Sequence, residues 1–341
     1  MLQKEELTPI FNEFNKQKVL IVGDVMIDAY IWGKVERISP EAPVPVVSVT
    51  RRENMLGGAA NVARNIKALG ATPLLCSVTG NDAKGKEFIE LMRSEGIDPI
   101  GIVTSQKRIT TTKFRVIGNN TQMLRVDEEV DHDLDSHETS MLLQRVEQLL
   151  LHNNINVILL QDYNKGVLSA PVIDALLKLA NKRQIPIVVD PKKKNFERYV
   201  GVKLFKPNMK ELREGVNSDL SIENEAPLLA AIMQLQQQQQ LEMVMVTMSE
   251  KGMVLRYKND GYYLVHQQPA HLRSIADVSG AGDTVISVAA LCVAIGVDPT
   301  LMSFLANLAG GIVCEYTGVV PIDKQRLINE AQAWLTLSCN E

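Results

Sequence analysis

The sequence has little of what the simplest classes of functional site depend on. It contains four cysteines in 341 residues and no CxxC pair, which excludes a cysteine-ligated zinc site and favours a reducing, cytoplasmic compartment. The four are Cys76, Cys292, Cys314 and Cys339; three of them lie in apolar surroundings, which is typical of small buried hydrophobic residues. The five histidines show no HExxH or similar spacing, so no histidine-based metal site is expected.

Strong charge, aromatic residues and long apolar runs are missing as well. A formal net charge of −4 and an aromatic content of 5% argue against nucleic acid as a partner. The longest apolar run, residues 285–297, spans only 13 residues, too few to cross a bilayer. The charged N-terminal segment has no apolar stretch of the kind a signal peptide needs. We therefore expect a cytoplasmic protein that binds neither nucleic acid nor a membrane.

What the sequence does contain is an alternation of apolar runs and helical patterns. Runs rich in Val, Ile and Leu, with no polar alternation inside them, are typical of strands buried on both faces of a parallel sheet. They fall at residues 18–23, 74–78, 157–160, 185–189 and 243–247. Helical patterns lie between them at residues 59–69, 82–94, 136–151, 170–182 and 225–239. This order predicts an α/β fold with a mainly parallel, helix-covered sheet whose ligands gather at the carboxyl ends of the strands.

Two segments interrupt this alternation. Residues 30–50 and 108–127 are expected to be extended, and the second contains a turn signal at Gly118-Asn119-Asn120 that predicts a hairpin. We interpret the two segments as a small β-layer attached to the main sheet; two ordinary surface hairpins are the alternative. No Pro/Gly/Ser-rich linker divides the chain, so residues 1–341 are expected to form one domain.

The most specific motif is Asp277-Val278-Ser279-Gly280-Ala281-Gly282-Asp283-Thr284, directly before the apolar helix. Small residues at a helix start present free N–H groups, and the helix dipole adds positive potential, which suits a transferring phosphoryl group. Asp283 would lie in the first turn, where its carboxylate could accept a proton from an attacking hydroxyl. The alternative is that Asp283 only caps the helix and the glycines only form a turn.

A second motif, Asn208-Met209-Lys210-Glu211, follows a short extended stretch and a proline. Residues three apart share one face of a helix, so the Asn208 amide and the Glu211 carboxylate could hold Mg²⁺ together with nucleotide phosphates. The same pair also fits an N-cap with a capping-box glutamate. Both interpretations remain open from the sequence.

Other polar residues follow the predicted strands. Gly57, Gly58 and Asn61 open a helix and could approach a sugar, or could form a plain turn. Asp24 and Asp28 follow the first strand, where they would bind a ligand or cap a helix. Asp162, Lys165 and Lys192 place charge after two later strands; Lys113, Arg115 and Arg125 could share one face for an anionic group or be solvated strand charges.

Together these segments resemble the ribokinase-like (PfkB) carbohydrate kinase family, over residues 19–318. The resemblance rests on DVSGAGDT at 277–284, GGAANVARNIKALG at 57–70, TGNDAKG at 79–85 and PNMKE at 207–211, in the family's order. The sequence is most similar to the D-glycero-D-manno-heptose-7-phosphate kinase subgroup, through VGDVMIDAY at 22–30, RISPEAPVPVV at 37–47, LQDYNKGVL at 160–168 and VDPKKKNFERY at 189–199. Ser249 departs from the glycine of the wider family.

The resemblance implies a three-layer sandwich with a β-lid and a role for each motif residue. It implies that Asp283 is the catalytic base and that the N–H groups of Gly280, Ala281 and Gly282 form the anion hole. Substrate contacts are implied for Asp28, Gly57, Gly58, Asn61 and Asp162, with Lys113, Arg115, Arg125 and Lys165 on an existing phosphate. Nucleotide contacts are implied for Lys192, Asn208, Met209, Lys210, Glu211, Ser249, Gly252 and Asn307, with Asn208 and Glu211 holding Mg²⁺ directly or through water.

The activity that the resemblance implies is phosphorylation of D-glycero-D-manno-heptose 7-phosphate at O1 by ATP, in ADP-heptose biosynthesis for lipopolysaccharide. It also implies a homodimer formed through the β-lid and leaves activation by a monovalent cation such as K⁺ open. No HxGH motif occurs in the sequence, so a kinase without the nucleotidyltransferase domain of many relatives is expected. The alternatives are a kinase for another sugar or sugar phosphate, and a non-catalytic sugar-phosphate sensor.

Overall fold

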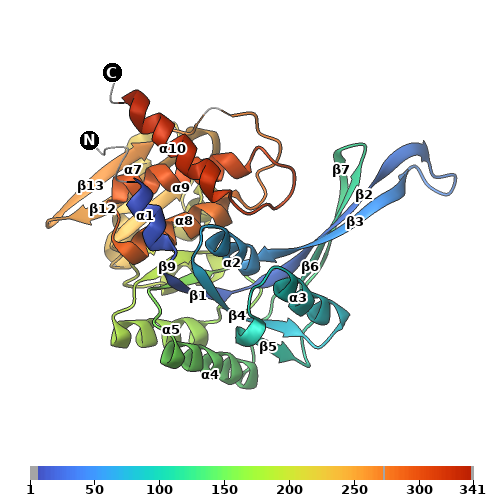
Figure 1. Cartoon of the computed structure of the whole chain (residues 1–341), viewed down its shortest axis with the longest axis horizontal. Helices are drawn as coiled ribbons and strands as arrows, with labels where there is room; N and C mark the ends of the chain where they lie inside the picture. The colour runs from blue at the N-terminus through green and yellow to red at the C-terminus, as the bar shows by residue number, and fades with distance from the viewer. Residues whose placement is uncertain (1–6, 272, 339–341) are drawn as a thin grey trace.

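The main sheet is mainly parallel, as predicted. The computed structural model describes residues 7–271 and 273–338, and among them nine strands form this sheet in the order β13-β12-β11-β10-β9-β8-β1-β4-β5 (Figure 1). Their bounds are β13 Tyr262–Gln268, β12 Met253–Asn259, β11 Met243–Thr247, β10 Leu204–Phe205, β9 Ile187–Asp190, β8 Val157–Gln161, β1 Lys18–Gly23, β4 Thr72–Gly80 and β5 Ile102–Ser105. The strands from β11 to β5 pair in parallel, and β12 and β13 add an antiparallel edge that the sequence pattern did not predict.

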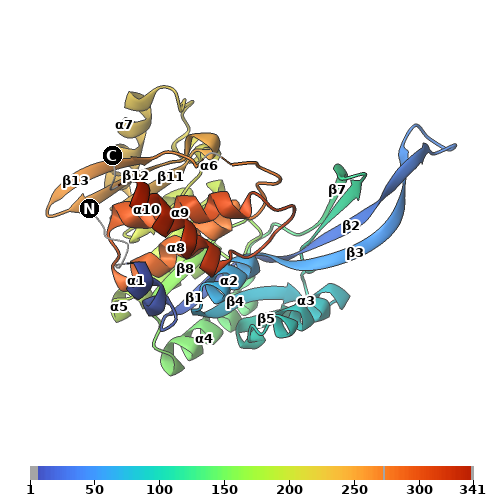
Figure 2. The ribbon, with the colours of Figure 1, turned by 45° about the horizontal axis from the view of Figure 1, so that its top comes forward.

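Helices cover both faces of this sheet and produce the expected three layers (Figure 2). One face carries α1 (Leu7–Phe14), α2 (Ala59–Ala68), α3 (Ala83–Ser94), α8 (Ala281–Ile295), α9 (Pro299–Val313) and α10 (Lys324–Ser338). The other carries α4 (Ser136–His152), α5 (Ala170–Arg183), α6 (Met209–Val216) and α7 (Glu225–Gln238). Alternate residues of β1 enter the two separate cores, Val19 and Ile21 on one side and Leu20 and Val22 on the other. Because both faces of β1 are buried, the apolar run at residues 18–23 has no alternation of polar and apolar residues.

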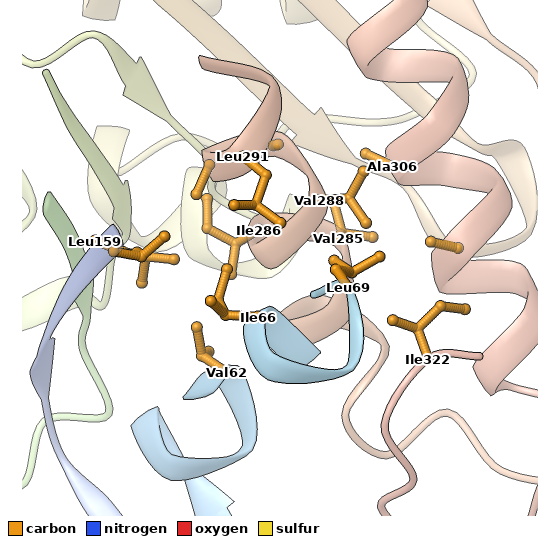
Figure 3. Packing of buried hydrophobic residues seen from close by; sticks show 14 of the residues in the cluster. Val62, Ile66, Leu69, Leu159, Val285, Ile286, Val288, Leu291, Ala306 and Ile322 are labelled. Atoms are coloured by element: carbon orange, nitrogen blue, oxygen red, sulfur yellow. The ribbon is translucent and has the colours of Figure 1, made fainter. Parts of the chain in front are cut away.

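The core beneath the glycine-rich motif is dry and close-packed. Val62, Ile66 and Leu69 form one stripe along and just after α2 and face Val285, Ile286 and Val288 of α8 (Figure 3). All of these side chains are buried, and α8 is apolar on every side because it lies between α2, α9 and the sheet. This packing fixes the position of the first turn of α8.

A second sheet extends from the body as a long arm, in the order β3-β2-β6-β7 (Figure 1). Its strands are β2 (Val25–Ile38), β3 (Pro45–Gly58), β6 (Thr112–Gly118) and β7 (Thr121–Glu128). β2 and β6 pair in parallel, so the two unusual segments form one sheet rather than two separate hairpins. The hairpin predicted near residue 118 is confirmed, because Asn119 and Asn120 both have positive φ, as a type I′ turn requires.

Several smaller predictions are tested by the described residues. Cys76 and Cys292 are buried and Cys314 is partly buried, all as free thiols, whereas Cys339 lies outside the described residues. Within residues 7–271 and 273–338, no helix combines the length and apolarity that crossing a bilayer requires. Asp24 and Asp28 do not cap a helix: Asp24 lies between β1 and β2, and Asp28 lies inside β2.

Candidate active site

The glycine-rich motif begins α8 with an unusual backbone. Gly280 has a φ of 80°, a left-handed conformation that glycine adopts at little cost, and it is the N-cap. Ala281, Gly282 and Asp283 then form the first turn, where N–H groups have no partner within the helix. The Ala281 N–H donates to the Val278 carbonyl at 3.3 Å, which engages one of the three donors predicted for the anion hole.

Asp283 does not cap its own helix; its carboxylate accepts hydrogen bonds from other elements. Asn61 Nδ2 of α2 donates at 2.8 Å, Gln161 Nε2 of β8 at 3.2 Å and the Tyr163 hydroxyl at 2.7 Å. The side chain is buried, and burial raises the pKa of Asp283 to about 7, although the hydrogen bonds from Asn61 and Tyr163 lower it. A fixed carboxylate with a pKa near 7 suits a general base at neutral pH.

Gln161 and Tyr163 were missed by the sequence reasoning, which selected their neighbour Asp162. All three residues end or follow β8, so the position at the end of a strand was the right signal for the site. The sequence did not show which of these side chains point toward Asp283. Asp162 points away from Asp283: it accepts hydrogen bonds from the Tyr199 hydroxyl and the Asn164 N–H, both at 2.8 Å. Burial, reinforced by the nearby Asp24 charge, raises the pKa of Asp162 to about 6.

Asp24 holds the loop that carries Tyr163. Its carboxylate accepts the backbone N–H groups of Tyr163 at 2.8 Å, Lys165 at 3.1 Å and Val167 at 3.0 Å. Burial raises the pKa of Asp24, and these three hydrogen bonds oppose that rise. These hydrogen bonds fix the backbone of the loop and leave the side chains of Tyr163 and Lys165 available for other contacts.

A buried ion pair lies beside the first turn of α8. Lys206 Nζ lies 3.0 Å from Asp190 Oδ2, and both side chains are buried at the carboxyl ends of neighbouring strands. A Cβ on Gly282 would lie 3.8 Å from Lys206 Nζ, so this ammonium adjoins the predicted anion hole. Gln161 Nε2 also donates to Asp190 Oδ2 at 3.2 Å and thus links the pair to Asp283. Lys206 was also missed, because the sequence places it inside an unremarkable extended stretch.

Asn208 and Glu211 form the capping box that was one of the two interpretations. Asn208 N–H donates to Glu211 Oε2 at 2.8 Å, and Glu211 N–H donates to Asn208 Oδ1 at 2.9 Å. The other Glu211 oxygen pairs with Lys192. Burial and the charge of Asp190 raise the pKa of Glu211, and Lys192 opposes this rise. In the same segment Met209 is buried in the core, and Lys210 is exposed beside Glu214.

These carboxylates fit a magnesium ion that is held mainly by nucleotide phosphates. In the part of the chain that the structure describes, no group of three His, Cys, Asp or Glu side chains forms a complete metal site. Mg²⁺ usually keeps waters and is bound through one or two carboxylates and substrate phosphates. Glu211 and Asp190 present such oxygens, and each forms an ion pair with a lysine, Lys192 and Lys206 respectively.

The remaining nucleotide candidates lie around one segment after β13. Gly252 has a φ of 88°, and a Cβ there would collide with the Gln268 carbonyl. Asn307 Nδ2 of α9 donates to the Pro269 carbonyl at 2.7 Å. Ser249 is exposed with a φ of 51°, a left-handed conformation that the glycine expected here from the resemblance would adopt at lower cost.

On the other side of Asp283, Asp28 lies on the inner part of the second sheet. It is buried and forms an ion pair with Arg115. Gly57, on the neighbouring strand, must be glycine because a Cβ would collide with the Asp28 carboxylate. Gly58, with a φ of 60°, then leads into α2, where Asn61 reaches Asp283. The structure thus connects these residues through one turn between β3 and α2.

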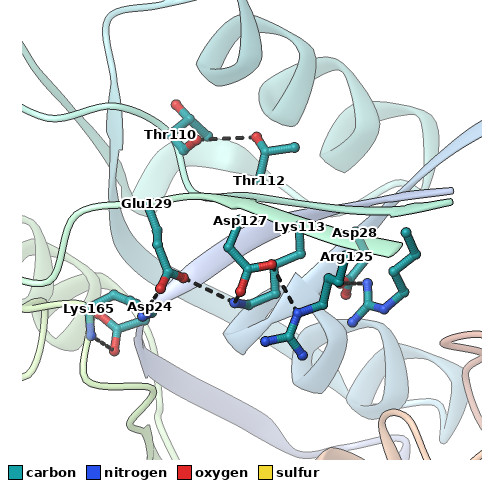
Figure 4. A network of polar contacts seen from close by, with 10 residues as sticks. Asp24, Asp28, Thr110, Thr112, Lys113, Arg125, Asp127, Glu129 and Lys165 are labelled. Atoms are coloured by element: carbon teal, nitrogen blue, oxygen red, sulfur yellow. Dashed lines mark hydrogen bonds and ion pairs between the residues drawn. The ribbon is translucent and has the colours of Figure 1, made fainter. Parts of the chain in front are cut away.

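All four basic residues predicted to bind a phosphate are paired with carboxylates (Figure 4). Lys113 Nζ lies 2.9 Å from Asp127 Oδ2 and 3.0 Å from Glu129 Oε2. Lys165 Nζ lies 2.6 Å from Glu129 Oε1. Arg125, more than half exposed, lies 3.0 Å from Asp127 and does not join the buried group. Lys113 and Arg115 are therefore not simply solvated strand charges.

Comparison with known proteins supports the carbohydrate kinase family that the sequence motifs indicated. The family model described as "pfkB family carbohydrate kinase" matches residues 16–325. The chain is 37% identical over 328 residues to the bifunctional protein HldE of Geobacter sulfurreducens, covering 96% of this chain and 65% of that protein. It is 40% identical over 271 residues to HldE of Helicobacter pylori, covering 80% and 57%. The chain thus spans at most about two thirds of these relatives.

Solved structures share the fold at low sequence identity. Phosphofructokinase-2 from Escherichia coli in complex with potassium matches with a TM-score of 0.77 and 20% identity, over 94% of this chain and 99% of that one. Ribokinase from Arabidopsis thaliana complexed with ribose and ATP matches with a TM-score of 0.68 and 16% identity, over 92% and 98%. These matches show a ribokinase-like fold.

Proposed function

The chain belongs to the pfkB family of carbohydrate kinases, and from that premise we propose that it phosphorylates D-glycero-D-manno-heptose 7-phosphate at O1 with ATP. The products would be the 1,7-bisphosphate and ADP, a step toward ADP-heptose. The HldE relatives and the segments shared with the heptose kinase subgroup support this substrate. The observation that carries the chemistry is Asp283, a buried carboxylate held by three neutral donors at a helix N-terminus.

In the proposed reaction Asp283 accepts the proton of the acceptor hydroxyl. The hydroxyl oxygen forms a bond to the γ-phosphorus, the bond from that phosphorus to the bridging oxygen breaks, and ADP leaves. Because Asn61, Gln161 and Tyr163 are neutral, they orient the carboxylate without cancelling its charge. The first-turn N–H groups of α8 and Lys206 stabilise the charge on the transferred group.

Nucleotide binding falls to the residues around Asp190. We propose that Lys192 and Lys206 contact nucleotide phosphates and that Glu211 and Asn208 hold Mg²⁺ with them, directly or through water. The ion, when bound, neutralises charge on the phosphates during transfer. Ser249, Gly252 and Asn307 would adjoin the nucleotide, and activation by K⁺ stays a prediction.

The second sheet is proposed as the lid and as the contact between two copies of the chain. Its outer part carries exposed apolar side chains, including Ile38, Val44, Val49 and Leu124. Exposed apolar side chains on a thin sheet favour burial against a partner. Closure over the sugar would exclude water, without which a kinase hydrolyses ATP unproductively.

One observation favours a second candidate, a kinase for a neutral sugar. The cations expected to bind the existing phosphate already have carboxylate partners. A site whose charges are satisfied internally does not need an anionic ligand. The two candidates differ in one measurable property, the preference for a phosphorylated over a free sugar.

The deciding experiment compares kcat/KM for heptose 7-phosphate, free heptose, ribose and fructose 6-phosphate. A phosphate carries about two negative charges, and two lost charge-assisted hydrogen bonds weaken substrate use at least about a hundredfold. We expect heptose 7-phosphate to be preferred by that factor over free heptose. Arg115→Ala and Lys165→Ala should erode the preference, whereas Lys194→Ala, on an exposed ion pair, should not. Equal use of ribose and heptose 7-phosphate would leave only the family assignment, and no ADP release with any sugar would favour a sensor.

A further inference from the structure

Glu129 occupies the centre of the basic cluster in an unusual way. It follows β7, and its two oxygens bind lysines from two parts of the fold: Lys113 on β6 at 3.0 Å and Lys165 in the loop after β8 at 2.6 Å (Figure 4). Lys113, Lys165 and Glu129 are each at least 70% shielded from solvent. Glu129 is therefore a bridging anion between the second sheet and the main body.

The three residues differ in how firmly they are held. The backbone of Lys165 is fixed by Asp24, so only its side chain can exchange partners. Lys113 has a second carboxylate, Asp127 at 2.9 Å, and stays paired when Glu129 leaves. Glu129 lies just after the last residue of β7, outside the strand pairing, so its side chain can turn away without breaking the sheet.

The charge balance of the cluster shows what can replace Glu129. Lys113, Arg115, Arg125 and Lys165 form ion pairs with Asp28, Asp127 and Glu129, and the charge of Asp277 also acts on Arg115. When the Glu129 carboxylate leaves, Lys165 loses its ion pair and Lys113 loses one of its two, so a phosphate dianion can take the place of the carboxylate. Phosphate also presents several oxygens to bridge the same two ammonium groups.

We propose that Glu129 is a specificity-determining residue that holds Lys113 and Lys165 until the phosphate of the acceptor displaces it. This rests on the proposed function in that the acceptor carries a phosphate. A free anion can form ion pairs only with Lys113 and Lys165, and to do so it must break the ion pairs that both lysines form with Glu129. Its net gain is therefore small, and it binds weakly. A sugar phosphate also gains the contacts of its sugar and displaces Glu129. The residue thus protects the phosphate subsite from simple anions.

The test measures binding of inorganic phosphate to the whole chain by calorimetry, with Glu129→Gln as the variant. Each pair to Glu129 is of the strength of a partly shielded surface ion pair, so losing both as competitors should tighten phosphate binding about tenfold. Glu128→Gln is the matched control, because this neighbour is exposed and the charge change is the same. Adding Lys165→Met to Glu129→Gln should cancel the gain.

The outcomes separate this inference from the proposed substrate. Unchanged or weaker phosphate binding in a folded Glu129→Gln protein would overturn it and make Glu129 a structural bridge only. If that variant does not fold, Glu129→Asp keeps the charge but shortens the reach, and it should tighten phosphate binding by a smaller factor. Phosphate binding needs no sugar, so failure of heptose 7-phosphate as a substrate would refute the substrate alone. If heptose 7-phosphate is used, its KM should fall in Glu129→Gln and stay unchanged in Glu128→Gln.

Discussion

The surroundings of Asp283 and the inner part of the second sheet shift the pKa of a carboxyl group in opposite directions. Around Asp283 the partners are neutral, so burial dominates and its pKa is raised to about 7. Partial burial also raises the pKa of Asp127, but the hydrogen bonds and charges of Lys113 and Arg125 outweigh it and the net shift is downward. Neutral donors keep a charge available for chemistry, whereas cations neutralise it and can exchange partners.

The comparison also concerns rigidity. Asp283, the proposed base, lies in the first turn of α8, which is packed between α2, α9 and the main sheet. The arm of the second sheet, in contrast, has large exposed side chains and only one layer. The fold therefore places the proposed base on its closely packed part and the proposed acceptor contacts on the second sheet, whose outer part is more exposed.

The largest expected effect is the loss of the base. Asp283→Asn keeps the size and the acceptor for Asn61 or Tyr163 but cannot take a proton, so kcat should fall by roughly 10²–10⁴. ATP affinity should change little, because no nucleotide contact is removed. Steady-state kinetics and nucleotide titration check both statements. A variant that retains more than about a tenth of wild-type kcat would remove Asp283 from the mechanism.

A matched pair of leucines tests the difference in packing. Leu291 on α8 is fully buried, and Leu291→Ala should lower the free energy of unfolding by about 2–5 kcal/mol. Leu124 on β7 is 56% exposed, and Leu124→Ala should change it by less than about 0.5 kcal/mol. Denaturant unfolding of both variants gives the two values. A large cost at Leu124 would mean that the second sheet is buried in the assembly that was measured.

The pH dependence sharpens the contrast in charge. The ionised form of Asp283 is the base, and its pKa is about 7, so kcat/KM should rise with pH and level off above that value. Well below it, the rate should fall about tenfold per pH unit. The Tyr163 hydrogen bond lowers the pKa of Asp283, so Tyr163→Phe should move the profile to higher pH while keeping the ring beneath Lys192. If the pH dependence of kcat/KM is the same in this variant as in the wild type, the group that titrates is not Asp283.

The smallest effect is expected at Glu211. Glu211→Gln should raise the Mg²⁺ concentration for half-maximal rate several-fold, because a carboxylate ligand becomes an amide. The amide retains an acceptor and a donor, so much of the capping box survives. Magnesium titrations of the variant against wild type check this, with thermal unfolding as the control for the helix. An unchanged Mg²⁺ requirement would leave the pair as a helix cap alone.

Most of the architecture could be predicted from sequence because the strand and helix signals are strong and local. The runs at 18–23 and 243–247 match β1 and β11 residue for residue, and the type I′ turn follows directly from two asparagines. The edge strands β12 and β13 were missed because polar residues such as Arg256 and Gln267 interrupt their apolar runs, and because most of β13 is exposed. The join of β2 to β6 carries no local signal.

The candidate site was predicted in part, and the omissions have one cause. The motif at 280–283 is recognisable from its glycines, which predict the start of a helix. In the structure Asp283 lies in the first turn of that helix. Gln161, Tyr163 and Lys206 were not found because their role depends on which strands become neighbours, and Asp162 was chosen over residues on either side of it. The ion pairing of Lys113 and Lys165 is likewise a property of the assembled sheet.

The parallel pairing of β2 with β6 has a consequence for how the chain folds during synthesis. Asp28 pairs in register with Lys113, and α2, β4, α3 and β5 of the main body lie between them in the chain. At about 5–20 residues per second, the ribosome takes several seconds to supply the second strand after the first. During that interval β2 has an unpaired edge that could join another nascent chain. The buried carboxylate of Asp28, near the start of that edge, opposes such joining, so the residue proposed to contact the sugar would also protect the unfinished chain.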